Sequence, residues 1–499
     1  MFEVWHSDLA ARIGRLQTLH GAVETPAFVP VVHPVRQTVS TQFLKKMGFD
    51  LVITNAYITL RHYGDEARRR GIHDIINYDG AVMTDSGGYQ VLEYGSVEVE
   101  PAMMAQFEND IKSDIPIPLD RPTGYGLEYE KAKEYVAITL KNALESLRVI
   151  GNTGAIWVAP VQGAEHFDLV EHSARELDTM GFEMMALGSP VELMEAYEFA
   201  MLARMIISAK RVIPAKPIHL FGAGHPLTIP LAIALGCDTF DSASYMLYAK
   251  DNRYMTSNGT VRLDELAYLS CQCPVCSSHT VQEFHKMEMD KRTIEIAKHN
   301  LYILKAEVEA VKQAIMDGRL WEYVMQKARA HPKLMEAAQI FKDVEMLEDG
   351  TPLFKERAIF FYDPIDQHRP EAKRFRKTVA TFESSKKKLI LCPEDEIHPF
   401  YSTTSYKNIV KKFPDAQICS YSPFLGVIPA EISDVFPASH NLATRSCYRL
   451  EDYPTFIESL KSFAGRFEEI AVIAPDDFMK EATKAARLNA RLVDDISAL

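Results

Sequence analysis

Long apolar runs are missing from this sequence, and its first residues do not show the pattern of a leader. No stretch approaches the roughly 20 apolar residues that a membrane-spanning helix needs, and the first residues, MFEVWHSDLAARIG, lack the basic and apolar regions of a secretory signal. Cysteine is scarce, at 7 of 499 residues, and four of the seven stand far apart, at positions 237, 392, 419 and 447. Such spacing is not that of a disulfide framework. We therefore expect a cytoplasmic protein in a reducing compartment, with no membrane association.

Positive charge is also limited. The 55 Lys and Arg residues are outnumbered by 68 Asp and Glu residues, which gives a net charge of −13. Broad binding to a nucleic-acid backbone needs many cations against the phosphates, so any contact with nucleic acid should be local. The densest basic segment lies between Lys355 and Lys412, although a basic run more often covers a solvated helix face.

The sequence has no long internal repeat, no low-complexity tract and no glycine-rich phosphate loop. The segment GAGHP at 222–226 resembles part of a dinucleotide-binding fingerprint but lacks its third glycine, so we do not expect a dinucleotide cofactor. The chain is 47% apolar and 25% charged, which predicts a globular protein of two or three domains.

Short apolar runs alternate with helical patterns up to about residue 245, and the helical patterns include 127–149 and 166–180. Eight of the runs are candidate strands: 27–32, 50–55, 81–85, 114–120, 155–161, 182–188, 217–222 and 238–243. Eight parallel strands with helical crossovers predict an α/β fold of the (β/α)8 TIM-barrel type. An open, doubly wound sheet is the alternative.

The rest of the chain is expected to form two further parts. The pattern breaks around 348–352, so we predict a catalytic domain at 1–350, which includes a zinc-binding subdomain at about 262–340. Residues 351–499 carry apolar runs separated by helical stretches and predict a small α/β accessory domain.

Three cysteines lie within six residues, at Cys271, Cys273 and Cys276, and His299 follows one helix later. Zinc prefers four thiolate or imidazole ligands in a tetrahedron, so this spacing predicts one structural Zn²⁺. His279 is a rival fourth ligand. We favour His299 because it falls within a long helical pattern, 290–315, that can hold a ligand rigidly.

Polar residues fall where the candidate strands end, and these ends converge on one mouth of a barrel. Asp85 is followed by Gly87, Gly88 and Tyr89, which offer exposed N–H groups and a stacking ring to a flat heterocycle such as a nucleobase. Asp241 supplies a second carboxylate. Two carboxylates at one pocket suit displacement at a sugar anomeric carbon, where one attacks and the other transfers protons. Either aspartate alone would more often be a turn former.

Five segments, in this order, resemble the tRNA-guanine transglycosylase family: TDSGGYQV at 84–91, VQG at 161–163, ALGSP at 186–190, FDSA at 240–243 and the cysteine cluster with His299. The resemblance covers residues 5–340. The segments 119–124, 219–226 and 240–256 are more similar to the archaeal branch, the archaeosine tRNA-guanine transglycosylases, than to the bacterial one. Two later segments, 360–375 and 424–437, resemble the accessory domains of that branch.

The resemblance implies a role for each matching residue. Asp241 would be the nucleophile at ribose C1′, and Asp85 the general acid and base. The implied base-binding residues are Ser86, Gly87, Gly88, Tyr89, Asp120, Gln162 and Gly188. The implied reaction replaces the D-loop guanine at position 15 of tRNA with 7-cyano-7-deazaguanine. A carboxylate at Asp120 suits the N–H and amine edge of a guanine-like base, since it accepts from both.

The resemblance also raises expectations about partners. Archaeal members usually end in an RNA-binding module of the PUA type, for which this sequence has too few residues, so a separate PUA-type chain is expected to assist. A homodimer through the zinc subdomain is implied as well. Two alternative functions are a non-catalytic tRNA-binding paralogue, which should have lost an acidic residue, and a transglycosylase that acts on DNA.

Overall fold

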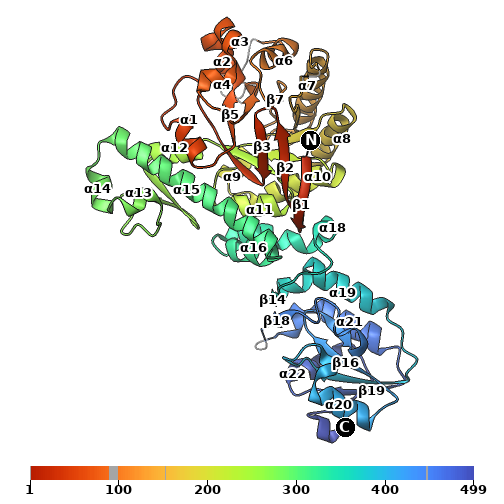
Figure 1. Ribbon diagram of the computed structural model, residues 1–499. Helices are drawn as coiled ribbons and strands as arrows, with labels where there is room; N and C mark the ends of the chain where they lie inside the picture. Colours follow the sequence, from red (N-terminus) through yellow and green to blue (C-terminus); the bar gives the residue numbers. More distant parts are fainter. Residues whose placement is uncertain (1, 89–98, 152, 445–447) are drawn as a thin grey trace. The chain divides into compact units, whose positions relative to one another are not determined.

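The computed structural model describes residues 2–88, 99–151, 153–444 and 448–499. The chain forms two compact units, which are taken here one at a time (Figure 1). The barrel unit comprises the residues up to Met316 together with Tyr323–Ile340, and the C-terminal unit comprises Asp317–Glu322 and Phe341–Leu499. No helix among these described residues is both long and apolar enough to cross a membrane.

Eight parallel strands form the centre of the barrel unit, each within one of the predicted runs. They are β4 (Ala27–Pro30), β5 (Leu51–Asn55), β6 (Ala81–Asp85), β7 (Ile115–Ile117), β8 (Val158–Val161), β9 (Met184–Leu187), β10 (Ile218–Leu220) and β11 (Thr239–Ser242). They pair in the orders β4-β11-β10-β9-β8 and β5-β6-β7. A bridge between Val31 and Ile53 joins the two groups at one seam, and the Ile156 N–H donates to the Asp114 carbonyl at 2.9 Å at the other. The sheet therefore closes, which confirms the (β/α)8 barrel over the open sheet.

Seven of the eight strands are shorter than their predicted runs, and β6 has the predicted bounds. β7 keeps three residues of the seven predicted, while Asp114 and Asp120 on either side of it use their carboxylates in side-chain contacts. The barrel interior is apolar and includes Val29, Ile53 and Met184. This packed interior leaves the strand ends as the places where polar side chains can gather.

An antiparallel sheet precedes the barrel, and the sequence analysis did not predict it. It consists of β1 (Phe2–Asp8), β2 (Ala11–Thr18) and β3 (Gly21–Thr25), in that order. Leu16 and Val23 from this sheet belong to the same apolar cluster as the barrel strands. The sheet therefore covers the end of the barrel where the parallel strands begin.

Helices surround the barrel, and α7, α8 and α10 pack side by side on its outside (Figure 1). The helices before the zinc-binding insertion are α1 (Thr41–Lys46), α2 (Ala56–Tyr63), α3 (Asp65–Arg70), α4 (Ile72–Ile76), α6 (Pro101–Asp110), α7 (Tyr129–Leu147), α8 (Phe167–Thr179), α9 (Val191–Glu195), α10 (Phe199–Val212), α11 (Thr228–Ala234) and α12 (Ser244–Lys250). The helices predicted at 127–149 and 166–180 correspond to α7 and α8.

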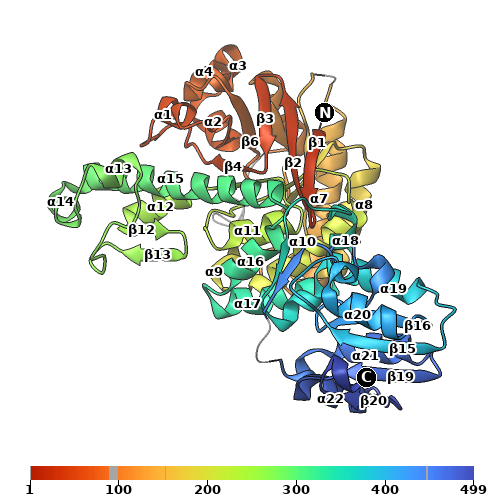
Figure 2. The same cartoon turned by 60° about the horizontal axis from the view of Figure 1, so that its bottom comes forward.

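The cysteine cluster lies in an insertion after β11, which extends away from the barrel in Figure 2. It contains the hairpin β12 (Arg253–Thr256) and β13 (Gly259–Arg262), then α13 (Pro274–Ser277), α14 (Val281–Lys286) and the long α15 (Met289–Met316). The helix predicted at 290–315 is α15, which packs along α12. Helix α16 (Leu320–Ala328) includes residues of both units, and α17 (Pro332–Gln339) packs on α10.

The C-terminal unit is an α/β structure, as predicted. Its sheet has the order β17-β16-β15-β19-β20, in which only β17 is antiparallel to its neighbour. The strands are β15 (Lys388–Pro393), β16 (Ala416–Ser422), β17 (Gly426–Pro429), β19 (Glu469–Ile473) and β20 (Arg491–Val493); a parallel pair, β14 (Ile359–Phe361) and β18 (Asn441–Ala443), stands apart. The helices are α18 (Met346–Gly350), α19 (Pro370–Thr381), α20 (Thr404–Lys412), α21 (Pro454–Ala464) and α22 (Asp477–Ala485).

The apolar strand β15 explains why this unit has helices on both faces of its sheet. Successive side chains of a strand point to opposite faces. Leu389 and Leu391 join a core cluster with residues of α19, α21 and α22, whereas Ile390 and Cys392 join a second cluster with Ile409 of α20. A strand without polar alternation is therefore buried on both sides.

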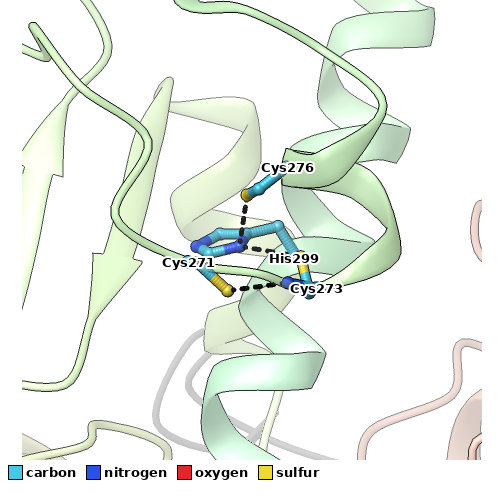
Figure 3. Close-up of side chains that lie close together, drawn as sticks. All are labelled: Cys271, Cys273, Cys276 and His299. Atoms are coloured by element: carbon cyan, nitrogen blue, oxygen red, sulfur yellow. Dashed lines mark hydrogen bonds between the residues drawn. The ribbon is translucent and has the colours of Figure 1, made fainter.

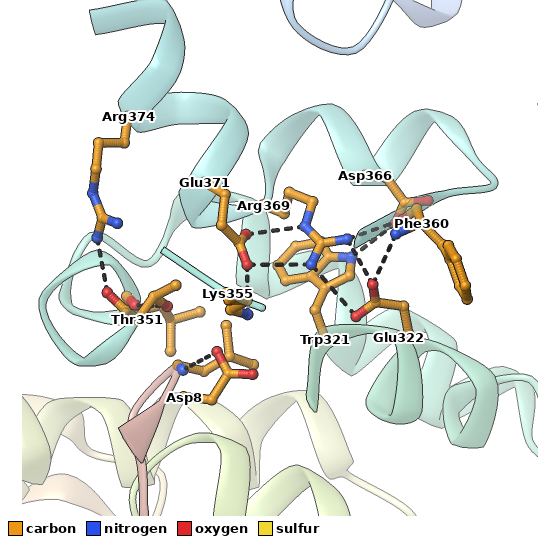
Figure 4. Close-up of polar contacts among 12 residues, drawn as sticks. Asp8, Trp321, Glu322, Thr351, Lys355, Phe360, Asp366, Arg369, Glu371 and Arg374 are labelled. Atoms are coloured by element: carbon orange, nitrogen blue, oxygen red, sulfur yellow. Dashed lines mark hydrogen bonds and ion pairs between the residues drawn. The ribbon is translucent and has the colours of Figure 1, made fainter. Parts of the chain in front are cut away.

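A buried ion cluster lies within the C-terminal unit (Figure 4). The guanidinium of Arg369, which is fully buried, donates to Glu371 and to Glu322, both at 3.0 Å. The Lys355 ammonium lies 2.6 Å from Glu371. Although burial opposes ionisation, the neighbouring cations hold the pKa of Glu371 well below its ordinary value. Glu322, whose side chain is 10% exposed, therefore depends on Arg369 for charge compensation, and fully buried Glu371 depends on Arg369 and Lys355.

We expect Arg369→Met to destabilise the C-terminal unit by about 3–5 kcal/mol, because it leaves buried carboxylates without their partner. Urea unfolding is the measurement. Lys377→Met is the matched control in α19, the helix that Arg369 immediately precedes, since the Lys377 side chain is 71% exposed in its pair with Glu348. It should cost under about 1 kcal/mol. Equal losses in the two variants would show that burial does not decide the strength of the cluster.

Candidate active site

The predicted polar residues meet at the end of the barrel where the parallel strands finish. Asp85 is the last residue of β6, Asp120 follows β7, and Asp241 lies in β11. The negative charge of Asp241 helps to raise the pKa of Asp85, and the charge of Asp85 helps to raise that of Asp120. The three carboxylates therefore share one site.

The Asp85 carboxylate is held by two donors. The Asn55 side-chain amide donates to Oδ2 at 3.0 Å, and the Gly87 N–H donates to Oδ1 at 3.3 Å. Burial raises the pKa of Asp85 to about 6, the charge of Asp241 acts in the same direction, and the two hydrogen bonds oppose the rise. A carboxyl group with such a pKa exchanges a proton near neutral pH, as a general acid and base must.

Asp120 pairs with Gln162, whose amide donates to Oδ2 of Asp120 at 2.5 Å. The oxygen of the Gln162 amide accepts from the Thr123 N–H at 3.1 Å and from the Ser189 hydroxyl at 3.0 Å, which fixes the orientation of the amide. Burial raises the pKa of Asp120 to about 7, and the nearby Asp85 carboxylate adds to the effect. Near neutral pH the Asp120 carboxyl group is therefore present in both forms, ionised as an acceptor of hydrogen bonds and protonated as a donor.

At two positions of the predicted site, Gly88 and Gly188, there is no room for a side chain. A Cβ at Gly88 would lie 1.7 Å from Oδ1 of Asp120, and one at Gly188 would lie 2.1 Å from the Gln162 amide nitrogen. The Gly188 N–H donates to the Val161 carbonyl at 2.9 Å. Any side chain at either position would displace the Asp120–Gln162 pair.

Asp241 receives both of its hydrogen bonds, within the described part of the chain, on Oδ1. The donors are the imidazole Nε2 of His219 at 3.1 Å and the Gly222 N–H at 3.0 Å. His219 is fully buried, and its other ring nitrogen pairs with the Thr239 hydroxyl at 2.9 Å. This arrangement fixes the carboxylate and leaves Oδ2 without a hydrogen bond among the described residues.

The sequence analysis did not identify His219, Asn55, Thr123 or Ser189 as site residues. A signal for His219 lies in the strand pairing. His219 of β10 stands opposite Thr239 of β11 in the parallel ladder, and Thr239 lies two residues before Asp241. Alternate residues of a strand share one face, so His219 and Asp241 point to the same side. A histidine in one strand and an aspartate in the next are therefore a pair worth testing.

Three predicted base-binding residues remain: Ser86, Gly87 and Tyr89. Ser86 is fully buried, and within the described residues its hydroxyl has no hydrogen-bond partner. Gly87 has a positive φ of 101° and turns the chain so that its N–H meets Asp85. Tyr89 lies outside the described residues.

Cys271, Cys273, Cys276 and His299 form one cluster, shown in Figure 3, whose ligand atoms all lie within 4.8 Å of one another. The sulfurs of Cys276 and Cys273 lie 3.3 and 3.5 Å from Nδ1 of His299. A tetrahedral zinc ion would place such atoms about 3.5 Å apart. His299 Nε2 is 2.8 Å from the Met255 carbonyl, which orients the ring. The four residues therefore fit a zinc ion.

The rival ligand His279 takes a different position. Its ring packs edge-on against Phe284, with ring centroids 5.5 Å apart, and it is not part of the cluster. The choice of His299 over His279 agrees with this geometry, because α15 brings His299 back against the cysteines.

Fold and site together define a class of protein, a (β/α)8 barrel with carboxylates at its mouth and a Cys3His insertion after the last strand. Residues 7–333 match the family model described as queuine tRNA-ribosyltransferase, and the chain belongs to this family. It is 42% identical to a tRNA-guanine(15) transglycosylase of Aeropyrum pernix, over 88% of this chain and 86% of the relative.

Two further relatives carry the same name. The protein of Sulfolobus acidocaldarius is 40% identical over 87% of each chain. That of Methanosarcina barkeri is 38% identical over 99% of this chain and 98% of the relative. The likeness therefore extends through the C-terminal unit as well as the barrel.

Proposed function

We propose that this protein is a tRNA-guanine transglycosylase of archaeosine biosynthesis, which exchanges guanine 15 of tRNA for 7-cyano-7-deazaguanine. The observation that carries the proposal is the presence of Asp241 and Asp85, close enough to affect each other's charge, at one mouth of the barrel, in a chain whose relatives are named for this reaction. Both acidic residues are present, which favours an enzyme over a non-catalytic paralogue.

The first displacement releases guanine. Oδ2 of Asp241 forms a bond to ribose C1′ while the bond from C1′ to the base nitrogen breaks, and protonated Asp85 gives its proton to the departing guanine. The hydrogen bonds from His219 and Gly222 hold Asp241 in place for the attack. The product is a covalent glycosyl-enzyme, with Asp85 now ionised.

The second displacement installs the new base. Asp85 removes a proton from the incoming deazaguanine, whose nitrogen attacks C1′ and expels the Asp241 carboxylate. Atoms and charges return to their starting state. Two successive inversions give net retention at C1′.

Asp120 and Gln162 are proposed to read the edge of the base, with Ser86, Gly88, Tyr89 and Gly188 forming the rest of the pocket. The buried hydroxyl of Ser86, which has no partner among the described residues, supports this assignment because a bound base would supply one. Ionised Asp120 accepts from the ring N–H and the exocyclic amine of a guanine-like base, and it would face an acceptor in an adenine-like one.

We expect Asp120→Asn to weaken use of the deazaguanine by about 10–100-fold, since an amide donor would face donors on the base at a cost of about 1–3 kcal/mol. Binding of tRNA should change much less. Steady-state kinetics with the base as varied substrate, together with tRNA titrations, measure the two effects. Equal losses for base and tRNA would count against Asp120 as the reader of the base.

A cavity of about 430 Å³ near the barrel mouth supports a nucleic-acid substrate. It lies after β4 and β5 and is lined by His33, Val35, Arg36, Tyr57, Ile58, Arg61 and His62. Burial lowers the pKa of His33, and the charges of Arg36 and Lys250 lower it further. Guanidinium groups bind phosphate well and a tyrosine can stack on a base, so this local basic site suits a tRNA backbone in an acidic protein.

Two partners are proposed. The first is a second copy of this chain through the zinc-binding insertion, supported by exposed apolar side chains on and around it: Leu247, Tyr268 and Met289 are 58%, 84% and 65% exposed. The second is a basic RNA-binding chain of the PUA type. The net charge of −13 supports it, because added cations would strengthen tRNA binding.

We propose that the Cys3His cluster holds one Zn²⁺ with a structural role, since four protein ligands leave no position for substrate or water. Cys276→Ser should lower the zinc content from about one per chain to well below one, at a cost on the order of 5 kcal/mol in the stability of the insertion. Metal analysis and thermal unfolding are the measurements. His279→Ala is the control and should retain zinc; the opposite result for the two variants would make His279 the ligand.

The proposed function is tested by incubating the purified protein with unmodified tRNA and 7-cyano-7-deazaguanine, followed by mass analysis of the tRNA nucleosides. We expect incorporation of the deazaguanine at position 15 and release of one guanine for each base incorporated. A parallel incubation with duplex DNA tests the alternative substrate. No incorporation into tRNA, or incorporation into DNA alone, would contradict the proposal.

A further inference from the structure

A second cluster of metal-ligand residues lies at the opposite end of the barrel from the carboxylates. His20 is in the turn between β2 and β3, His73 is in α4, and Asp114 immediately precedes β7. The His20 Nδ1 lies 3.0 Å from Oδ1 of Asp114, and the His73 Nε2 lies 2.9 Å from Oδ2. The two imidazole rings lie close together, with centroids 3.7 Å apart and planes tilted by 32°. Three segments distant in sequence thus bring one possible ligand atom each to within 4.8 Å of the others.

The Asp114 carboxylate is oriented in advance. The side chain is fully buried, and each of its oxygens accepts a backbone N–H, from His20 and from Val82, both at 2.9 Å. Burial alone would raise the pKa of Asp114, but hydrogen bonds from His73, Val82 and His20 hold it below the ordinary value. The two backbone hydrogen bonds hold the carboxylate in one orientation.

We propose that His20, His73 and Asp114 bind a divalent transition-metal ion of the zinc class. All three ligand atoms lie within 4.8 Å of one another. Ligand atoms around tetrahedral zinc lie about 3.3–3.4 Å apart when each is about 2.0–2.1 Å from the ion, so the present nitrogen–oxygen distances need to open by only a few tenths of an ångström. The backbone donors to Asp114 remain in place as the outer shell that orients a ligating carboxylate.

Solvent completes the shell. The His20 side chain is 41% exposed, so an ion has a path from solvent, and a water molecule takes the fourth position. The set has no thiolate and one ligand fewer than the Cys3His cluster. Its ion should therefore bind more weakly and exchange readily. When bound, the ion ties the antiparallel sheet, through His20, to α4 and β7, and this adds stability to the closed end of the barrel.

The experiment uses the full-length protein with zinc retained in the Cys3His cluster and loose metal removed. Co²⁺ is titrated and its visible absorption recorded, because cobalt bound by nitrogen and oxygen gives weak bands without the thiolate charge-transfer band that Co²⁺ in the cysteine cluster would show. We expect one Co²⁺ per chain, and a rise in the unfolding temperature of about 2–5 °C at saturating metal.

His73→Ala and His20→Ala should each lose this cobalt signal and the thermal shift. His20 lies in an exposed turn, so its variant tests the site even if His73→Ala folds poorly. His172→Ala, an exposed histidine on α8, is the matched control and should keep both signals. The proposal is overturned if the unaltered protein binds no Co²⁺ beyond the cysteine cluster up to millimolar metal, or if His20→Ala retains the signal. In either case His20, His73 and Asp114 form a hydrogen-bonded cluster that binds no metal.

Discussion

Asp241→Asn is expected to abolish base exchange, with a fall in rate of about 10⁴-fold or more. An amide cannot form the glycosyl-enzyme, and no path of comparable barrier remains once the nucleophile is removed. The substitution keeps the shape of the side chain, and its oxygen can still accept from His219 and Gly222, so folding and tRNA binding should persist. Exchange of radiolabelled guanine into tRNA measures the rate, and denaturing gels measure the covalent adduct.

Asp79→Asn is the matched control for this substitution. Asp79 is exposed and precedes β6, so the same chemical change is made where that strand begins. It should exchange guanine and trap tRNA as the unaltered protein does. Appreciable turnover by Asp241→Asn, or a covalent adduct mapped to Asp85, would reverse the proposed roles of the two carboxylates.

Asp85→Asn should slow exchange by about 10²–10⁴-fold, because the amide has no proton to give to the departing guanine. The nucleophile is untouched, so a slow covalent adduct should still form. Burial raises the pKa of Asp85, so its ionised form costs stability at neutral pH, and the neutral amide removes this cost. The amide nitrogen would in turn face one of the two donors, Asn55 or Gly87, so the unfolding temperature should change little. Retention of the full rate would exclude Asp85 as the proton donor.

The same two carboxyl groups set the expected dependence on pH. Raised pKa values of about 6 for Asp85 and about 7 for Asp120 mean that the pair holds one proton between these values, mostly on Asp120. The reactive form, with the proton on Asp85 and with Asp120 ionised, is the minor one, and it is most populated in the same range. Below this range both groups are protonated and Asp120 cannot accept from the base. Above it both are ionised and Asp85 cannot donate. A profile of kcat/KM for tRNA should therefore be bell-shaped with a maximum between about pH 6 and 7, and Asp85→Asn should lose the fall at high pH.

Much of the fold could be predicted from short segments. Eight apolar runs became the eight barrel strands, and the spacing of three cysteines with a later histidine gave a cluster whose geometry fits zinc. Both patterns can be recognised in the sequence, because they consist of the spacing of apolar residues and of cysteines along the chain. The antiparallel sheet β1–β3 was missed, since its role is to cover the end of a barrel that does not exist until the strands have closed.

The sequence by itself determined which acidic residues stand where apolar strands end, namely Asp85, Asp120 and Asp241, and therefore which of them could gather at one mouth of a barrel. Only the tertiary structure decided how each of them behaves. His219 lies 22 residues before Asp241, and His20 lies 94 residues from Asp114, yet both pairs are in hydrogen-bond contact. Burial, which raises the pKa of Asp85 and of Asp120, likewise arises only when the barrel closes. Proton affinity and ligand geometry depend on neighbours in space, and the closure of the barrel selects those neighbours.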